Sequence, residues 1–232
     1  MKKSEARQII FEHLGGVLTP AGFRLRKREE AFARRIEGGV QVVGIPLIDY
    51  NPVFVFSLVI VIRLDVVEQI FHRFVNIDPK YYSQGTTTIT QLEYFIKEIP
   101  PEYCRDGAVD YKVRTPEDIA GAMAHLLPVV RGSILPFFER YQTVSAVHAG
   151  VNCSVPSIDS TQPPWGAMDA LILARLADSS DFERLVGLYY KHLHDRLRPE
   201  NRDRFDSLIA YLRRHSPTAL AQAGSGEGVS AI

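Results

Sequence analysis

Hydrophobic positions recur at three- and four-residue steps near the start of the chain, where residues 4–18 predict an amphipathic helix. The apolar stripe of this helix consists of Ala6, Ile10, Leu14 and Val17. Residues 19–22 then end it, because the residue before Pro20 is disfavoured in helical space and Gly22 tolerates a tight turn.

Alternating and continuous apolar runs follow and predict a β-sheet. Residues 23–36 alternate as two half-buried strands do, and residues 40–48 predict a third strand with a distortion at Gly44 or Pro46. Residues 53–64 hold the most apolar run. It is too short for a membrane helix and is rich in β-branched and aromatic residues, so it predicts a strand buried on both faces. Because the connections are short, we expect an antiparallel meander.

The next segments predict one short helix and two more strands. Asp65 is placed to cap a helix, and Glu68 stands three residues later, in the position that completes a capping box. Residues 86–92 have high β propensity, and Tyr111 with Val113 indicates a further short strand.

From Thr115 onward the pattern is helical. Thr115 is a good N-cap and Pro116 suits the first helical position. Pro128 and Pro136 are expected to kink or split the helix that follows. Beyond a loop over residues 150–166, three more helices are predicted, over residues 167–177, 182–197 and 200–214.

This order of elements indicates an α+β fold, because the strands and the C-terminal helices are segregated rather than alternating. We expect a mostly meander antiparallel sheet covered by helices, followed by an all-helical C-terminal segment. The expected organisation is an α+β domain over residues 1–149, a helical segment over 150–220 packed on the same core, and a disordered glycine-rich tail over 221–232.

Composition and charge narrow the classes of function. Lys plus Arg and Asp plus Glu both number 27, so the formal net charge is zero and supplies no global attraction to nucleic acid or to anionic membranes. No signal peptide or transit peptide is recognised, and Cys104 and Cys153 lack metal-ligand spacing. We therefore expect a cytoplasmic protein with reduced thiols and no membrane span.

Motifs that carry catalysis or cofactor binding are not found in the sequence. The seven histidines are scattered, and the zinc-protease, serine-hydrolase and phosphate-loop patterns are missing, so we expect no metal and no cofactor. A basic cluster runs from Arg24 to Arg35 but is interrupted by Glu29 and Glu30, which favours a solvated hairpin over a nucleic-acid surface.

Several segments resemble one family of proteins. Residues 18–27 (LTPAGFRLRK), 32–35 (FARR), 40–43 (VQVV) and 134–141 (ILPFFERY) are similar to those of a family of small bacterial proteins catalogued as a domain of unknown function. The resemblance covers roughly residues 9–142. Its motifs are a turn, a hairpin and a helix end, so it implies no catalytic residues. Some members of that family resemble immunity proteins, which implies a bacterial protein that binds a partner protein.

Two sets of candidate site residues follow. Polar residues that flank the apolar run of residues 53–62 are candidates for ligand binding, namely Asp49, Tyr50, Asn51 and Arg63. Aromatic residues of the type favoured at interface centres are candidates for partner binding, namely Trp165, Tyr81 and Tyr82.

The sequence therefore favours a cytoplasmic protein-interaction protein without catalytic activity, immunity-like by the resemblance. The alternative is an enzyme or a small-ligand-binding protein whose site is assembled from distant residues beside the central sheet. Self-association through the C-terminal helices is a third hypothesis.

Overall fold

The computed structural model describes residues 1–96, 98–105, 107–153, 165–193 and 197–225. The chain forms two compact units. The first contains residues 1–36, 40–62 and 89–140, and the second contains residues 37–39, 63–88 and 141–232. Residues 63–88 thus group with the C-terminal helices, because the helix they form packs against helices α6 and α9 described below.

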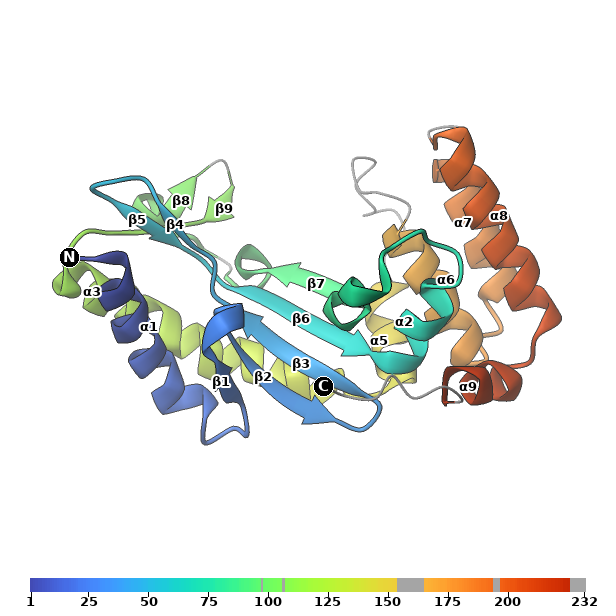
Figure 1. Cartoon of the computed structure of the whole chain (residues 1–232), viewed down its shortest axis with the longest axis horizontal. Helices are drawn as coiled ribbons and strands as arrows, with labels where there is room; N and C mark the ends of the chain where they lie inside the picture. The colour runs from blue at the N-terminus through green and yellow to red at the C-terminus, as the bar shows by residue number, and fades with distance from the viewer. Residues whose placement is uncertain (97, 106, 154–164, 194–196, 226–232) are drawn as a thin grey trace. The chain divides into compact units, whose positions relative to one another are not determined.

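A five-stranded antiparallel sheet confirms the expected α+β class. Its strand order is β1-β2-β3-β6-β7 (Figure 1). The strands are Arg24–Arg26 (β1), Ala31–Ile36 (β2), Gly39–Gly44 (β3), Val59–Leu64 (β6) and Thr88–Gln91 (β7). The sheet belongs to the first unit except for the strand ends Gly39, Arg63, Leu64 and Thr88, which belong to the second. Its first three strands form the predicted meander.

The apolar run of residues 53–64 is two strands, not one. Phe54–Phe56 (β5) pairs with Leu47–Asp49 (β4) and Tyr111–Val113 (β10) in a separate three-stranded sheet of order β10-β5-β4, whereas β6 joins the larger sheet. Only β5 is buried at every position; β6 alternates between buried and half-buried residues. The prediction of one strand buried on both faces is wrong, because a continuous apolar run does not reveal where the chain passes from one sheet to another.

Shorter elements complete the non-helical part of the chain. A two-stranded sheet consists of Cys104–Arg105 (β8) and Ala108–Val109 (β9). Four 3-10 turns are described, at Lys27–Glu29 (η1), Pro79–Gln84 (η2), Leu92–Phe95 (η3) and Pro101–Tyr103 (η4).

Helices of the first unit cover the larger sheet. Helix α1 (Lys3–Leu18) packs against α3 (Pro116–Val129), and the Phe11 ring of α1 meets the Phe32 ring of β2 edge to face at 6.1 Å. Thr115 and Asp118 form the capping box at the start of α3. A π-helical turn, Val130–Ile134 (η5), leads into α4 (Leu135–Arg140), so the two prolines are accommodated by a local change of helix type.

By length and composition alone, the helical run Pro116–Arg140 is able to cross a bilayer. This is weak evidence, because core helices of globular proteins meet the same test. The absence of a membrane span stays a prediction.

Gln41 organises the polar interior of the first unit. Its side chain is fully buried, its Oε1 accepts hydrogen bonds from Arg34 Nε and Nη2 at 3.0 and 2.7 Å, and its Nε2 donates to the Phe138 carbonyl at 2.7 Å. Arg34 also donates to the Ala21 carbonyl and pairs with Glu139. Arg34 of the basic hairpin is therefore not a solvated residue; it links β2, β3 and α4.

Replacing Gln41 with leucine is expected to lower the free energy of unfolding by about 2 kcal/mol, because two buried hydrogen-bonding partners lose their contact. Denaturant titration measures the change. Arg24→Ala, at an exposed position of the same hairpin, is the control and should stay within about 0.5 kcal/mol. Equal effects of the two substitutions would contradict the described role of Gln41.

The second unit is built around helix α6. Its helices are Asp65–Phe71 (α2), Val144–Val151 (α5), Trp165–Leu176 (α6), Phe182–Leu193 (α7), Pro199–Arg214 (α8) and Pro217–Ser225 (α9). Every residue of α6 from Ala167 to Ala174 is buried, and α2, α5, α7, α8 and α9 all pack against it. The predicted tail is thus helical as far as Ser225, and residues 226–232 lie outside the described part.

Candidate functional site

The start of α2 differs from the predicted capping box. Its N-cap is Leu64, which makes no side-chain cap. The Asp65 carboxylate accepts a hydrogen bond from Arg63 Nε at 2.9 Å instead. Glu68, expected to turn back toward the helix end, is buried with 1% of its surface exposed. The prediction failed because partners from elsewhere in the chain compete with the local cap.

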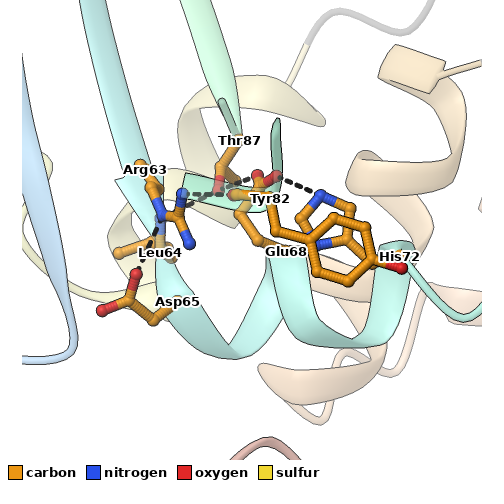
Figure 2. A network of polar contacts seen from close by, with 7 residues as sticks. All are labelled: Arg63, Leu64, Asp65, Glu68, His72, Tyr82 and Thr87. Carbon is orange, nitrogen blue, oxygen red and sulfur yellow. Dashed lines mark hydrogen bonds and ion pairs between the residues drawn. The ribbon is translucent and has the colours of Figure 1, made fainter. Parts of the chain in front are cut away.

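Thr87 holds the Glu68 carboxyl group in the interior. Its hydroxyl donates to Glu68 Oε1 at 2.9 Å and accepts the Leu64 backbone N–H at 2.8 Å (Figure 2). Both hydrogen-bonding functions of this hydroxyl are therefore used. Thr87 acts as a support for Glu68 and joins the end of β6 to α2.

The segment around η2 closes over the same carboxyl group. The Tyr82 ring stacks on the His72 ring with centroids 4.0 Å apart, and Arg63 Nη1 donates to the Tyr82 carbonyl at 2.6 Å (Figure 2). A Cβ atom on Gly85 would clash with Glu68 Oε2 and would lie 3.2 Å from His72 Nε2. Glycine is required at this position because the backbone passes directly over the carboxyl group.

A cavity of about 300 Å³ opens between this cluster and α6. Two pairs of lining residues are each spaced four apart, which places each pair on one helix face: Glu68 of α2 with His72 at the C-cap of that helix, and Trp165 with Asp169 on α6. The remaining lining residues are Phe71, Ile77, Tyr81, Gly85 and Thr86. The Trp165 and Phe71 rings meet edge to face at 5.8 Å, so one wall is aromatic.

Asp169 is the unusual member of this cavity. Only 6% of its surface is exposed, and its Oδ1 is buried without a hydrogen-bond partner among the described residues. A buried carboxyl oxygen normally has a partner, since leaving it without one is energetically costly. The wall of the cavity therefore includes a carboxyl group with one oxygen that the described residues do not satisfy.

Burial favours the neutral forms of the three titratable groups. Burial raises the pKa of Glu68 despite the opposing effects of the Thr87 hydrogen bond and the Arg63 charge. Burial, with the nearby Glu68 charge, raises the pKa of Asp169 well above its ordinary value. Burial and then the Arg63 charge lower the pKa of His72. The contact of 3.8 Å between His72 Nε2 and Glu68 Oε2 is consequently not a pair of full charges.

This arrangement offers hydrogen bonding and proton transfer. A protonated carboxyl group donates a hydrogen bond or a proton, and a neutral imidazole accepts one. Among the described residues, no group of three histidine, cysteine or acidic side chains is placed to hold a metal ion.

The structure brings together four of the residues singled out in the sequence. Tyr81 and Trp165 line the cavity, while Arg63 and Tyr82 support its edge. The other three ligand-binding candidates lie in the first unit and are exposed: Asp49 ends β4, and Tyr50 and Asn51 lie in the turn before β5. There Asp49 Oδ1 accepts the Asn51 backbone N–H at 2.9 Å, and Tyr50 is exposed.

Sequence reasoning missed three of the cavity residues. Glu68 was interpreted as a cap, and neither His72 nor Asp169 was singled out. A signal for Asp169 was present, because it is the one charged residue within the apolar stretch of residues 167–174. Such a residue in a buried helix needs an explanation.

A second hollow, of about 380 Å³, lies between α7 and α8. Its polar residues pair with each other: Arg213 binds Glu183, and Tyr190 donates to Asp206. That hydrogen bond, followed by burial, raises the pKa of Tyr190 to about 12. Because these polar groups are satisfied within the protein, the cavity at Asp169 is the stronger candidate site.

Comparison with protein-family models, with curated proteins and with solved structures finds no match for this chain, so its candidate site is defined by the geometry of its own residues.

Proposed function

We propose that the chain binds a small polar molecule in the cavity lined by Glu68, His72, Trp165 and Asp169. The observation that carries this proposal is Asp169, a residue of the cavity wall whose buried Oδ1 has no partner among the described residues. Small-molecule sites are typically apolar cavities with a few convergent polar groups whose pKa values are shifted. A bound molecule is a hydrogen-bonding partner for the Asp169 carboxyl group in this proposal.

A purely structural role explains only part of this cluster. Glu68, Thr87 and Arg63 connect β6, α2 and the η2 segment, and their hydrogen bonds account for their burial. Asp169 takes no part in those bonds. An apolar side chain at its position would serve packing better, since it would avoid the unfavourable burial of a carboxyl group.

Trp165 provides a direct readout of binding, because it is the only tryptophan of the chain and lines the cavity. A panel of small polar fragments, titrated while tryptophan emission is followed, should contain members that quench or shift the emission. Asp169→Leu, which replaces the carboxyl group with an apolar side chain, should abolish the response.

Asp49→Asn is the control variant, because Asp49 is an exposed candidate in the first unit. It should respond to fragments as the native chain does. The proposal fails if no fragment changes the emission of the native chain, or if Asp169→Leu responds as the native chain does.

Protein binding is a second candidate function, favoured by exposed apolar residues at a sheet edge in the first unit. β7 is the last strand of the larger sheet, and Ile89 on it is 58% exposed. Tyr94, in the η3 turn that follows, is 70% exposed. Edge strands and exposed aromatic residues are common sites of partner binding. The resemblance to immunity-like bacterial proteins supports the same function.

Affinity capture from a lysate of the source cells tests this second candidate. Substituting Ile89 with lysine together with Tyr94 with serine should abolish recovery of a partner. The matched control changes Ile48 to lysine and Tyr50 to serine, a pair of comparable exposure in the β4–β5 region. Equal recovery with both double variants, or no partner with the native chain, would count against protein binding through β7.

A further inference from the structure

We infer that the cavity takes a small organic cation, an ammonium group carried on an aromatic or apolar body, with Asp169 as the partner of the ammonium. This inference rests on the proposed ligand-binding function and adds the chemical class of the ligand. It follows from the charges that line the cavity, from the Asp169 oxygen that has no partner among the described residues and from the aromatic wall.

The charges of the lining residues favour a positive ligand. The cavity is lined by two carboxyl groups, Glu68 and Asp169, and none of the described lining residues is a lysine or an arginine. The guanidinium of Arg63, whose charge acts on Glu68 and His72, is held by other groups: its Nε donates to Asp65 at 2.9 Å and its Nη1 donates to the Tyr82 carbonyl at 2.6 Å. An anionic ligand would face two acids, whereas a cationic ligand offsets the charge that Asp169 acquires on ionisation.

The two acids are not equivalent as ligand groups. Glu68 Oε1 already accepts the Thr87 hydroxyl, and Gly85 lies against its Oε2. Asp169 Oδ1 has no such engagement among the described residues. An ammonium group has three N–H donors and no acceptor. It therefore complements an ionised carboxylate, whose oxygens accept hydrogen bonds and do not donate them. Asp169 is therefore the primary contact.

The aromatic side chains fit the rest of such a ligand. Trp165 and Phe71 form the edge-to-face pair of one wall, and Tyr81 also lines the cavity. Aromatic faces attract organic cations and pack against apolar or aromatic groups. Since Trp165 and Asp169 lie one helical turn apart on α6, one ligand is able to contact the ring and the carboxyl group together.

Three probes of nearly the same shape test the charge preference: benzylammonium, benzyl alcohol and benzoate. Each is titrated against the full chain, with calorimetry and tryptophan emission as readouts. Benzylammonium should bind at least about 10-fold more tightly than benzyl alcohol, because a charge-assisted hydrogen bond is roughly twice as strong as a neutral one. Benzoate should bind more weakly than both.

Asp169→Asn separates the charge from the shape of the cavity. It keeps the size of the side chain, so benzyl alcohol should bind as before while the preference for benzylammonium disappears. Asp49→Asn, at an exposed position of the first unit, should retain the preference.

The outcomes distinguish this inference from the proposed function. If benzyl alcohol or benzoate binds as tightly as benzylammonium, or if only fragments without positive charge bind, the cationic class is overturned and the cavity remains a binding site. If no fragment of any charge changes the emission of Trp165, the proposed function fails, and this inference fails with it.

Discussion

Gly85→Ala is expected to lower the free energy of unfolding by about 3 kcal/mol and to abolish the response of Trp165 emission to fragments. The added Cβ would clash with Glu68 Oε2 and would lie 3.1 Å from Glu68 Cδ and 3.2 Å from His72 Nε2. The substitution therefore acts directly on the candidate site and not only on the turn that contains it.

Neither side of this contact is free to move. The Glu68 carboxyl group is held by Thr87, whose hydroxyl is fixed in turn by the Leu64 N–H. The η2 segment is held by the hydrogen bond from Arg63 to the Tyr82 carbonyl and by the stacking of Tyr82 on His72. Because packed interiors resist small displacements, the clash is relieved only by breaking one of these interactions.

A double-mutant cycle with Glu68→Ala identifies the cause. Truncating Glu68 removes the atoms that the new methyl group would strike. Gly85→Ala should therefore lower the free energy of unfolding by about 2 kcal/mol less in the Glu68→Ala background than in the native chain, as measured by denaturant unfolding. Gly39→Ala is the matched control, because its Cβ would clash with the Arg63 backbone carbonyl and no side-chain truncation relieves that. Additive effects of Gly85→Ala and Glu68→Ala would contradict the described contact.

Gly16→Ala separates these local clashes from a general effect of replacing glycine. Gly16 lies on the exposed side of α1, with no atom within 4 Å of the added Cβ. Alanine is the better helix former, so this variant should gain up to about 1 kcal/mol. A loss of stability at Gly16 comparable to that at Gly85 would remove the argument from close packing.

The elements that the sequence predicted correctly are those determined by residues close together in the chain. The stripe of α1, the strand at residues 31–36 and the Thr115 cap with Pro116 depend on neighbours within a few residues, and the structure confirms all three. The partition of residues 53–64 into β5 and β6 depends instead on which strands pair with each half. Those partners lie elsewhere in the chain, so the apolar pattern alone held no information about the break.

The candidate site was predictable only in fragments. Tyr81, Tyr82 and Trp165 were singled out as aromatic residues and Arg63 for its position beside the apolar run, but nothing local indicated that they would meet. Glu68 fits a capping box by spacing, and only tertiary contact with Thr87, 19 residues away, gives it a different role. When a site is assembled from two helices that are distant in sequence, the sequence of either segment alone contains little information about it.

The free energy of unfolding of the native chain is expected to fall as the pH rises above about 4, the ordinary pKa of an aspartate. Burial raises the pKa of Asp169, so between the unfolded and folded pKa values the folded chain holds a proton that the unfolded chain has released. The stability linked to this group is complete below the unfolded pKa and is lost as the pH rises through the folded pKa. The slope reaches about 1.4 kcal/mol per pH unit for one proton.

Glu68 and His72 also contribute to the dependence of the unfolding free energy on pH. The pKa of Glu68 is also raised by burial, and since it interacts with Asp169 the two protons leave in coupled steps. His72 acts in the opposite sense. Its pKa is lowered by burial, so its stabilising contribution is present above about pH 6.5 and is lost as the pH falls through the folded pKa. The native profile alone therefore does not isolate Asp169.

Asp169→Asn isolates it, because asparagine has nearly the same size and does not titrate. At low pH, the difference in unfolding free energy between the native chain and this variant should be constant. Above about pH 4, the free energy of unfolding of the native chain should fall relative to that of the variant. Denaturant unfolding at a series of pH values measures it, with Asp49→Asn as the control whose profile should run parallel to that of the native chain. Parallel profiles for Asp169→Asn as well would mean that Asp169 titrates as an exposed acid does. The buried, unpartnered oxygen on which ligand binding was proposed would then not exist in solution.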